Sequence, residues 1–173
     1  WITTYNRELI NFSYIQKRWE PLLPYDDYLT SQVNVIEGIK SKNNKRIDFI
    51  TDKDLNIRAH VSDEFDKLCY TPAGNSATLA FAKQVVAKSE MGQDEVVDVL
   101  NIVLDVPRYI SHRYGPESVE YEDMLYRLDD TIAEFLKVVD VCYPNQRDYL
   151  IVLTADHGMG HSNTSPNREL YNF

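Results

Sequence analysis

The second half of the sequence alternates short apolar runs with amphipathic segments, and this alternation constrains the fold more than any other feature. Between residues 117 and 143, apolar side chains recur at helical spacing, and Pro144 ends the segment. The runs at 96–104 and 149–154 are short and mostly apolar, as in buried strands. A helix between two such strands predicts a βαβ unit, and therefore an α/β fold with a parallel sheet flanked by helices.

A second helix is predicted before this unit, because apolar residues recur at helical spacing from Leu79 to Val86 and Gly92 follows them. Upstream, aromatic residues and prolines occur without a clear period, and only residues 11–19 have a helical pattern. We therefore expect an irregular cap-like or linking segment over residues 1–64, followed by a partial α/β domain over residues 65–173.

Composition narrows the partners of the chain. Its 173 residues, 43% of them hydrophobic, suffice for one domain with a core. The net charge of −9 argues against nucleic acid or an anionic membrane as the main partner, although bound metal ions could still attract a phosphorylated substrate. Cys69 and Cys142 are too few for a disulfide framework, and we expect buried thiols.

Side chains suited to metal binding follow both predicted strands where each strand ends. Asp105 and His112 follow the first strand, and Asp156 and His157 follow the second. Because parallel strands end at the same edge of a sheet, we predict that His112, Asp156 and His157 share a metal site. Each residue also has a structural interpretation: Asp156 could cap a helix, His112 could be an ordinary hydrogen-bonded histidine, and Asp105 could simply close its strand.

Four motifs in one consistent order resemble the alkaline phosphatase superfamily, and in particular its bacterial PafA-type branch. They are TPAGN at 71–75, YISHRYG at 109–115, EYEDMLYRLD at 120–129 and TADHG at 154–158, and DVLNI at 98–102 also fits the family in the same order. The resemblance covers about residues 65–158. It implies an alkaline phosphatase-like α/β domain, a phosphorylated small-molecule substrate, and a protein that is periplasmic or secreted.

The resemblance also implies a two-zinc site in the parent enzyme. By position, Asp156 and His157 would bind one zinc ion and His112 the other. The aspartate that precedes the histidine in the family falls on Arg108, which cannot ligate a metal. Either that site is lost, or Asp105 has taken over, or Arg108 points away or contacts phosphate.

Other parts of the family's machinery have no counterpart in this sequence. The nucleophilic Thr or Ser lies upstream of the matched region in the family, and the last zinc histidine lies beyond it. We therefore expect a fragment of a zinc-dependent phosphomonoesterase with a phosphoenzyme mechanism, inactive alone, whose partners are the missing N- and C-terminal parts of the same protein. The alternatives are a phosphodiesterase or nucleotide pyrophosphatase of the same superfamily, and a degenerate, non-catalytic binding domain, which Arg108 favours.

Overall fold

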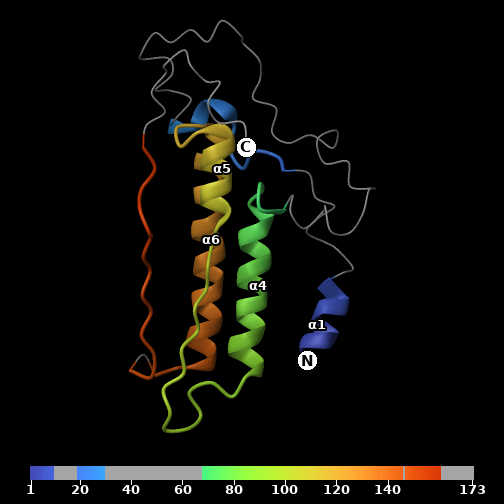
Figure 1. Ribbon diagram of the computed structural model, residues 1–173, viewed down its shortest axis with the longest axis vertical. Helices are drawn as coiled ribbons and strands as arrows, with labels where there is room; N and C mark the ends of the chain where they lie inside the picture. The colour runs from blue at the N-terminus through green and yellow to red at the C-terminus, as the bar shows by residue number, and fades with distance from the viewer. Residues whose placement is uncertain (10–18, 30–67, 146, 161–173) are drawn as a thin grey trace, which may run out of the picture.

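The computed structural model describes residues 1–9, 19–29, 68–145 and 147–160. In these residues every regular element is helical (Figure 1), in the order α1 (Ile2–Leu9), the short 3-10 helix η1 (Tyr25–Asp27), α4 (Ala73–Lys88), α5 (Val106–Tyr114) and α6 (Val119–Cys142). Helix α6 is the central element, because it contacts both α4 and α5. The helix expected at 11–19 and most of the proposed cap-like segment lie outside the described residues.

Helix α6 confirms the strongest prediction from the sequence to within two residues. Ser118 caps it, with its Oγ accepting a hydrogen bond from the Tyr121 amide at 3.2 Å, and Glu120 and Glu122 lie in the first turn. The helix ends at Cys142, two residues before Pro144. None of the described helices is long and apolar enough to cross a membrane.

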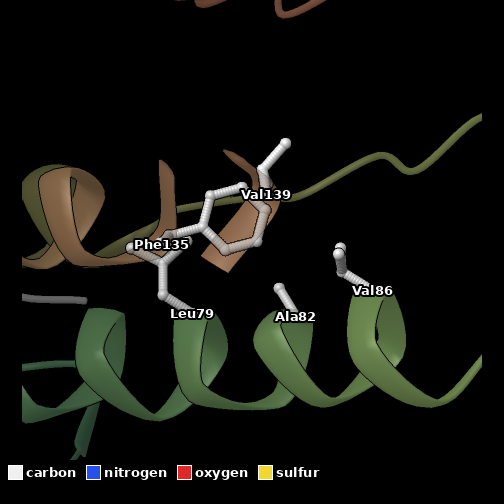
Figure 2. Close-up of a cluster of buried hydrophobic side chains, with 5 residues drawn as sticks. All are labelled: Leu79, Ala82, Val86, Phe135 and Val139. Carbon is white, nitrogen blue, oxygen red and sulfur yellow. The ribbon is translucent and has the colours of Figure 1, made fainter. Parts of the chain in front are cut away.

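Helices α4 and α6 lie side by side and form the larger apolar core (Figure 2). The buried side chains of this core are those of Leu79, Ala82, Val86, Phe135 and Val139. Helix α4 confirms the expected helix but ends at Lys88, so Gly92, with φ of +68°, lies in the turn that follows. Cys69 and Cys142 are not joined in a disulfide, as expected from the sequence, and both are partly rather than fully buried.

Helix α5 was not expected from the sequence, which predicted only that Asp105 and His112 follow the first strand. The Val106-Pro107 pair begins the helix, because proline fits the first helical turn, where its missing amide would have no intrahelical partner. The helix buries Val106 and Ile110 against Trp19 and Met124 in a second apolar core.

The two predicted strands run in the same direction in Figure 1, opposite to α6, but form no strand within the described residues. The first alternates along its length: three even-numbered side chains pack on the α4–α6 core, and the odd-numbered ones between them are exposed. The inward residues are Leu100, Ile102 and Leu104, whereas Val99 and Val103 face outward. This is the period of a strand that has one face covered.

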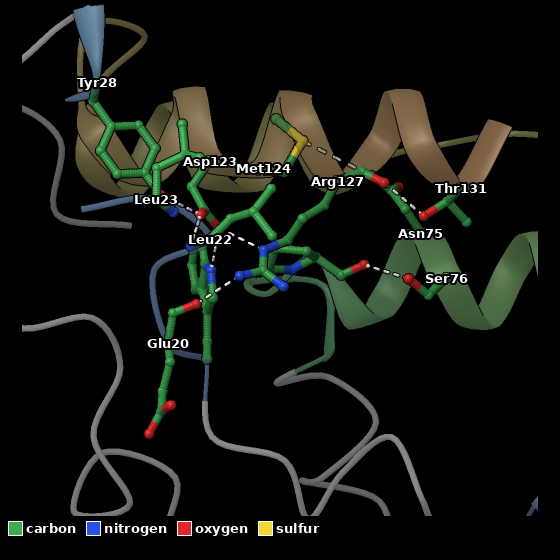
Figure 3. A network of polar contacts seen from close by, with 12 residues as sticks. Glu20, Leu22, Leu23, Tyr28, Asn75, Ser76, Asp123, Met124, Arg127 and Thr131 are labelled. Carbon is green, nitrogen blue, oxygen red and sulfur yellow. Dashed lines mark hydrogen bonds and ion pairs between the residues drawn. The ribbon is translucent and has the colours of Figure 1, made fainter. Parts of the chain in front are cut away.

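A clasp of polar contacts ties residues 19–29 to the first turns of α6 (Figure 3). Its centre is Asp123, whose carboxylate is fully buried and accepts four hydrogen bonds of 2.6–2.7 Å. The donors are Trp19 Nε1, the Leu22 amide, Tyr28 Oη and Arg127 Nε. Trp19 also packs on α5, so the clasp sets how α5 lies against α6.

Candidate functional site

Asp156 and His157 lie near the end of the second extended segment, and both side chains are exposed, at 81% and 65%. The His157 amide donates to Asp156 Oδ1 at 3.0 Å, and His157 Nδ1 lies 2.9 Å from the Gly158 carbonyl oxygen. The tautomer with a proton on Nδ1 donates to that carbonyl and leaves the Nε2 lone pair available to a metal.

The spacing of these two side chains fits a shared cation. His157 Nε2 and Asp156 Oδ2 are 3.5 Å apart, and in the tautomer protonated on Nδ1 both atoms are acceptors. Two ligands of a tetrahedral zinc ion with bonds of about 2.0–2.1 Å lie about 3.3 Å apart. By donor type and by distance, Asp156 and His157 can therefore hold one divalent ion together.

His112 lies in the last turn of α5 and is exposed. Together with Asp105 and Arg108 it occupies positions i, i+3 and i+7, which share one face of a helix. The opposite face carries the buried Val106 and Ile110. The face of α5 that turns away from the core is thus the face with the candidate site residues.

Asp105 and Arg108 form a bidentate ion pair on this face. Arg108 Nε donates to Asp105 Oδ1 at 3.2 Å, and Arg108 Nη2 donates to Asp105 Oδ2 at 3.0 Å. Hydrogen bonding from Arg108 holds the pKa of Asp105 below its usual value. Asp105 is therefore paired with Arg108, and its role as a replacement metal ligand stays a prediction.

The structure does not gather these residues into one cluster. Among the described residues, no group of three or more His, Cys, Asp or Glu side chains could hold a metal ion. In Figure 1, α5 and the end of the second extended segment lie toward the same end of the molecule, where α6 begins. The convergence of His112 with Asp156 and His157 stays a prediction.

An aromatic and cationic patch on α5 was not found from the sequence. Arg113 lies over the rings of Tyr70 and Tyr114, each 5.4 Å from its guanidinium carbon, and Arg108 lies 4.5 Å over Tyr109. The motif at 109–115 shows neighbouring Arg and Tyr residues in the sequence. The contact with Tyr70 could not be predicted, because Tyr70 lies in a distant segment. These contacts fix the two guanidinium groups on the surface of α5.

Comparison with known proteins gives relatives along nearly the whole chain. Alkaline phosphatase PhoV of Synechococcus elongatus is 28% identical over 167 residues, which cover 93% of this chain and 28% of the relative. Alkaline phosphatase PafA of Elizabethkingia meningoseptica is 30% identical over 162 residues, covering 94% and 29%. A Myroides odoratus protein named calcium-transporting ATPase is 32% identical over 166 residues, covering 94% and 29%.

The chain thus spans less than a third of the length of these curated relatives. No solved structure matches it significantly. The family model for type I phosphodiesterase / nucleotide pyrophosphatase matches residues 7–172. That family has the α/β fold of the alkaline phosphatase superfamily, in agreement with the resemblance read from the motifs. The chain belongs to the type I phosphodiesterase / nucleotide pyrophosphatase family of this superfamily of phosphoester hydrolases.

Proposed function

We propose that this chain supplies part of the metal-binding half of a zinc-dependent phosphomonoesterase, and that the nucleophile belongs to another part of a longer protein. The observation that carries the proposal is the Asp156–His157 pair, whose two ligand atoms lie 3.5 Å apart near the exposed end of the second extended segment. Relatives named alkaline phosphatase, matched over more than 90% of this chain, support the phosphomonoester substrate.

In this proposal the two extended segments are neighbouring strands of a parallel sheet. Their common direction in Figure 1 supports it, as does the two-residue alternation of the first segment. Val97 and Leu150 are each 87% exposed, so apolar surface on both segments is open to further strands and helices. Those elements would come from the rest of the longer protein.

Each candidate residue then has a defined part. Asp156 and His157 bind one divalent cation, with the Gly158 carbonyl fixing the imidazole tautomer. His112 on α5 matches the position of a ligand of the second ion in the family. A zinc ion held by Asp156 and His157 would polarise the phosphoryl group and stabilise the charge that develops on it. The exposure of Asp156 and His157 leaves room for the phosphorylated substrate and for the remaining ligands.

Two measurements test the proposal. The 173-residue chain should bind Zn²⁺ weakly in calorimetry and should lose that binding in Asp156→Ala, whereas Asp129→Ala, an exposed acidic position on α6, should keep it. In the longer protein, Asp156→Ala or His157→Ala should lower kcat/KM for p-nitrophenyl phosphate by at least about 100-fold. Robust turnover by the isolated chain would refute the assignment of the nucleophile to another part.

A second function of the same class is favoured by the family match itself. The matching family model is that of phosphodiesterases and nucleotide pyrophosphatases, so a phosphodiester substrate is the alternative. Bis-p-nitrophenyl phosphate distinguishes the two functions, because the longer protein should hydrolyse it faster than the monoester only if the diester is its substrate. A non-catalytic binding domain is the third candidate, supported by the Arg108–Asp105 pair.

A further inference from the structure

Arg108 lies one helical turn before His112 on the exposed face of α5. Side chains four residues apart on a helix are neighbours and can hold one ion together. Asp105, by contrast, is seven residues from His112, which corresponds to about 10 Å along the helix axis. Of the residues on this face, the one at position 108 is therefore best placed to share a metal ion with His112.

Two independent contacts hold the guanidinium of Arg108 on Asp105 and Tyr109. The carboxylate of Asp105 accepts two hydrogen bonds from it, at 3.0 and 3.2 Å, and the Tyr109 ring lies 4.5 Å from its central carbon. An arginine side chain remains protonated at every accessible pH and has no lone pair to offer a metal. The residue one turn before His112 therefore offers no ligand atom to a metal ion, and the carboxylate of Asp105 is paired with its guanidinium.

We infer that Arg108 takes the place of a metal ligand one turn before His112, so that this chain holds one divalent cation, at Asp156 and His157, and none at His112. The inference rests on the proposed function, because it assumes that Asp156 and His157 bind a cation.

An ordinary surface ion pair is the simpler explanation of the same contacts. Asp105 and Arg108 are about half exposed, and such pairs commonly shift an equilibrium by less than tenfold. The two explanations differ in what they predict for metal stoichiometry. If Arg108 is only part of a surface ion pair, its substitution leaves the number of bound ions unchanged. If Arg108 stands in place of a metal ligand, a carboxylate at that position raises the number.

The experiment counts Zn²⁺ ions bound to the untagged 173-residue chain by calorimetry and native mass spectrometry. The key variant is Arg108→Asp, which places a carboxylate one turn before His112. The matched control is Arg113→Asp, which makes the same charge change on α5. Residue 113 is adjacent to His112 in sequence, but consecutive side chains on a helix point in different directions, so a carboxylate there cannot share an ion with His112. Circular dichroism checks that each variant keeps its helices.

We expect one bound ion in the wild type and in Arg113→Asp, and two in Arg108→Asp. The second ion should disappear in the double variant Arg108→Asp/His112→Ala, and the ion of the wild type should survive His112→Ala. Equal stoichiometry and affinity in the Arg108→Asp and Arg113→Asp variants would overturn the inference. So would a wild-type ion that depends on His112.

Failure of the proposed function gives a different result. If the wild type binds no Zn²⁺ while Arg108→Asp gains one ion through His112, the Asp156–His157 assignment is wrong and the role of Arg108 is supported. If no variant binds Zn²⁺, both are wrong. Arg108→Lys retains the charge without the bidentate geometry, and it should behave as the wild type does.

Discussion

Replacing Asp123 with asparagine should release the clasp that joins residues 19–29 to α6. The carboxylate is fully buried, and each of its oxygens accepts two of the four hydrogen bonds. Asparagine keeps one acceptor oxygen, but its NH2 group replaces the other. That NH2 group would face the two donors that the replaced oxygen accepted from. Hydrogen bonds to a charged group are worth about 1.5–3 kcal/mol each, and removing one partner of a buried ion pair costs about 3–5 kcal/mol.

We therefore expect Asp123→Asn to lower the free energy of unfolding by about 3–5 kcal/mol, a large share of the stability of a domain of this size. Urea denaturation measures this loss. In a Trp1→Phe background Trp19 is the remaining tryptophan, and its quenching by acrylamide should increase at urea concentrations where circular dichroism still shows the α4–α6 helices. That core does not include Asp123.

The matched control is Asp129→Asn, the same substitution at an exposed position of the same helix, which should change stability by less than about 0.5 kcal/mol. If Asp123→Asn behaves like this control in both measurements, the clasp does not hold the segment and the reasoning fails. Loss of all helical signal at zero denaturant would instead show that the clasp is needed for the whole fold.

The pH dependence of the clasp follows from the same contacts. Burial raises the pKa of Asp123, but donation from Arg127, Tyr28, Trp19 and the Leu22 amide outweighs burial, so the pKa lies below its usual value. A carboxyl pKa that is depressed in the folded state stabilises the fold above the unfolded pKa of about 3.9. The wild type should lose this stability as the pH falls through the folded value, and Asp123→Asn should lose much less over the same window.

Four further outcomes are expected. Burial raises the pKa of Glu120, so its charge opposes folding at neutral pH, and Glu120→Gln should gain up to about 1 kcal/mol at pH 7 but nothing below about pH 4 in urea titrations. Burial and the hydrogen bond to Asp123 raise the pKa of Tyr28 to about 12, so stability present below pH 10 should fall as the pH rises toward 12, and Tyr28→Phe should show a smaller loss. Leu79→Ala should cost about 2–5 kcal/mol in the same assay, because the residue is 2% exposed in the α4–α6 core. Gly74→Ala should cost about 1–3 kcal/mol, because an added Cβ would lie 2.6 Å from the Leu68 carbonyl oxygen, whereas Gly160→Ala, which meets nothing within 4 Å, should be neutral.

A helix could be predicted where the signals that start, pattern and end it lie within its own stretch of sequence. Helix α6 has a periodic apolar stripe, a Ser118 cap and a terminating proline, and all three signals are local. Helix α5 was missed although Pro107 in its first turn is a start signal, because the segment follows a strand pattern and is only nine residues long. The clasp at Asp123 could not be predicted, since its partner Trp19 is 104 residues away in sequence.

The candidate site was predictable in part for the same reason. Asp156 and His157 are adjacent in sequence, so their proximity required no knowledge of the fold. Their relation to His112 depends on how two extended segments lie relative to each other, which no local pattern specifies. The sequence shows that Asp105 and Arg108 are three residues apart. An arginine side chain is long enough to reach several partners, however, and only the structure shows that Arg108 pairs with Asp105.

The exposed apolar residues on the two extended segments connect the fold with the proposed function. The sequence predicted strands that are buried on both faces, and the structure covers one face of the first segment with α4 and α6. Val97 and Leu150 remain 87% exposed. Burying such apolar surface would gain a free energy of about 25 cal/mol for each Å² removed from water. The same extended segments carry the candidate ligands at or just beyond their ends. A partner that covers the apolar residues would therefore also fix the direction of both ends, so we expect its addition to raise the affinity of Asp156 and His157 for Zn²⁺.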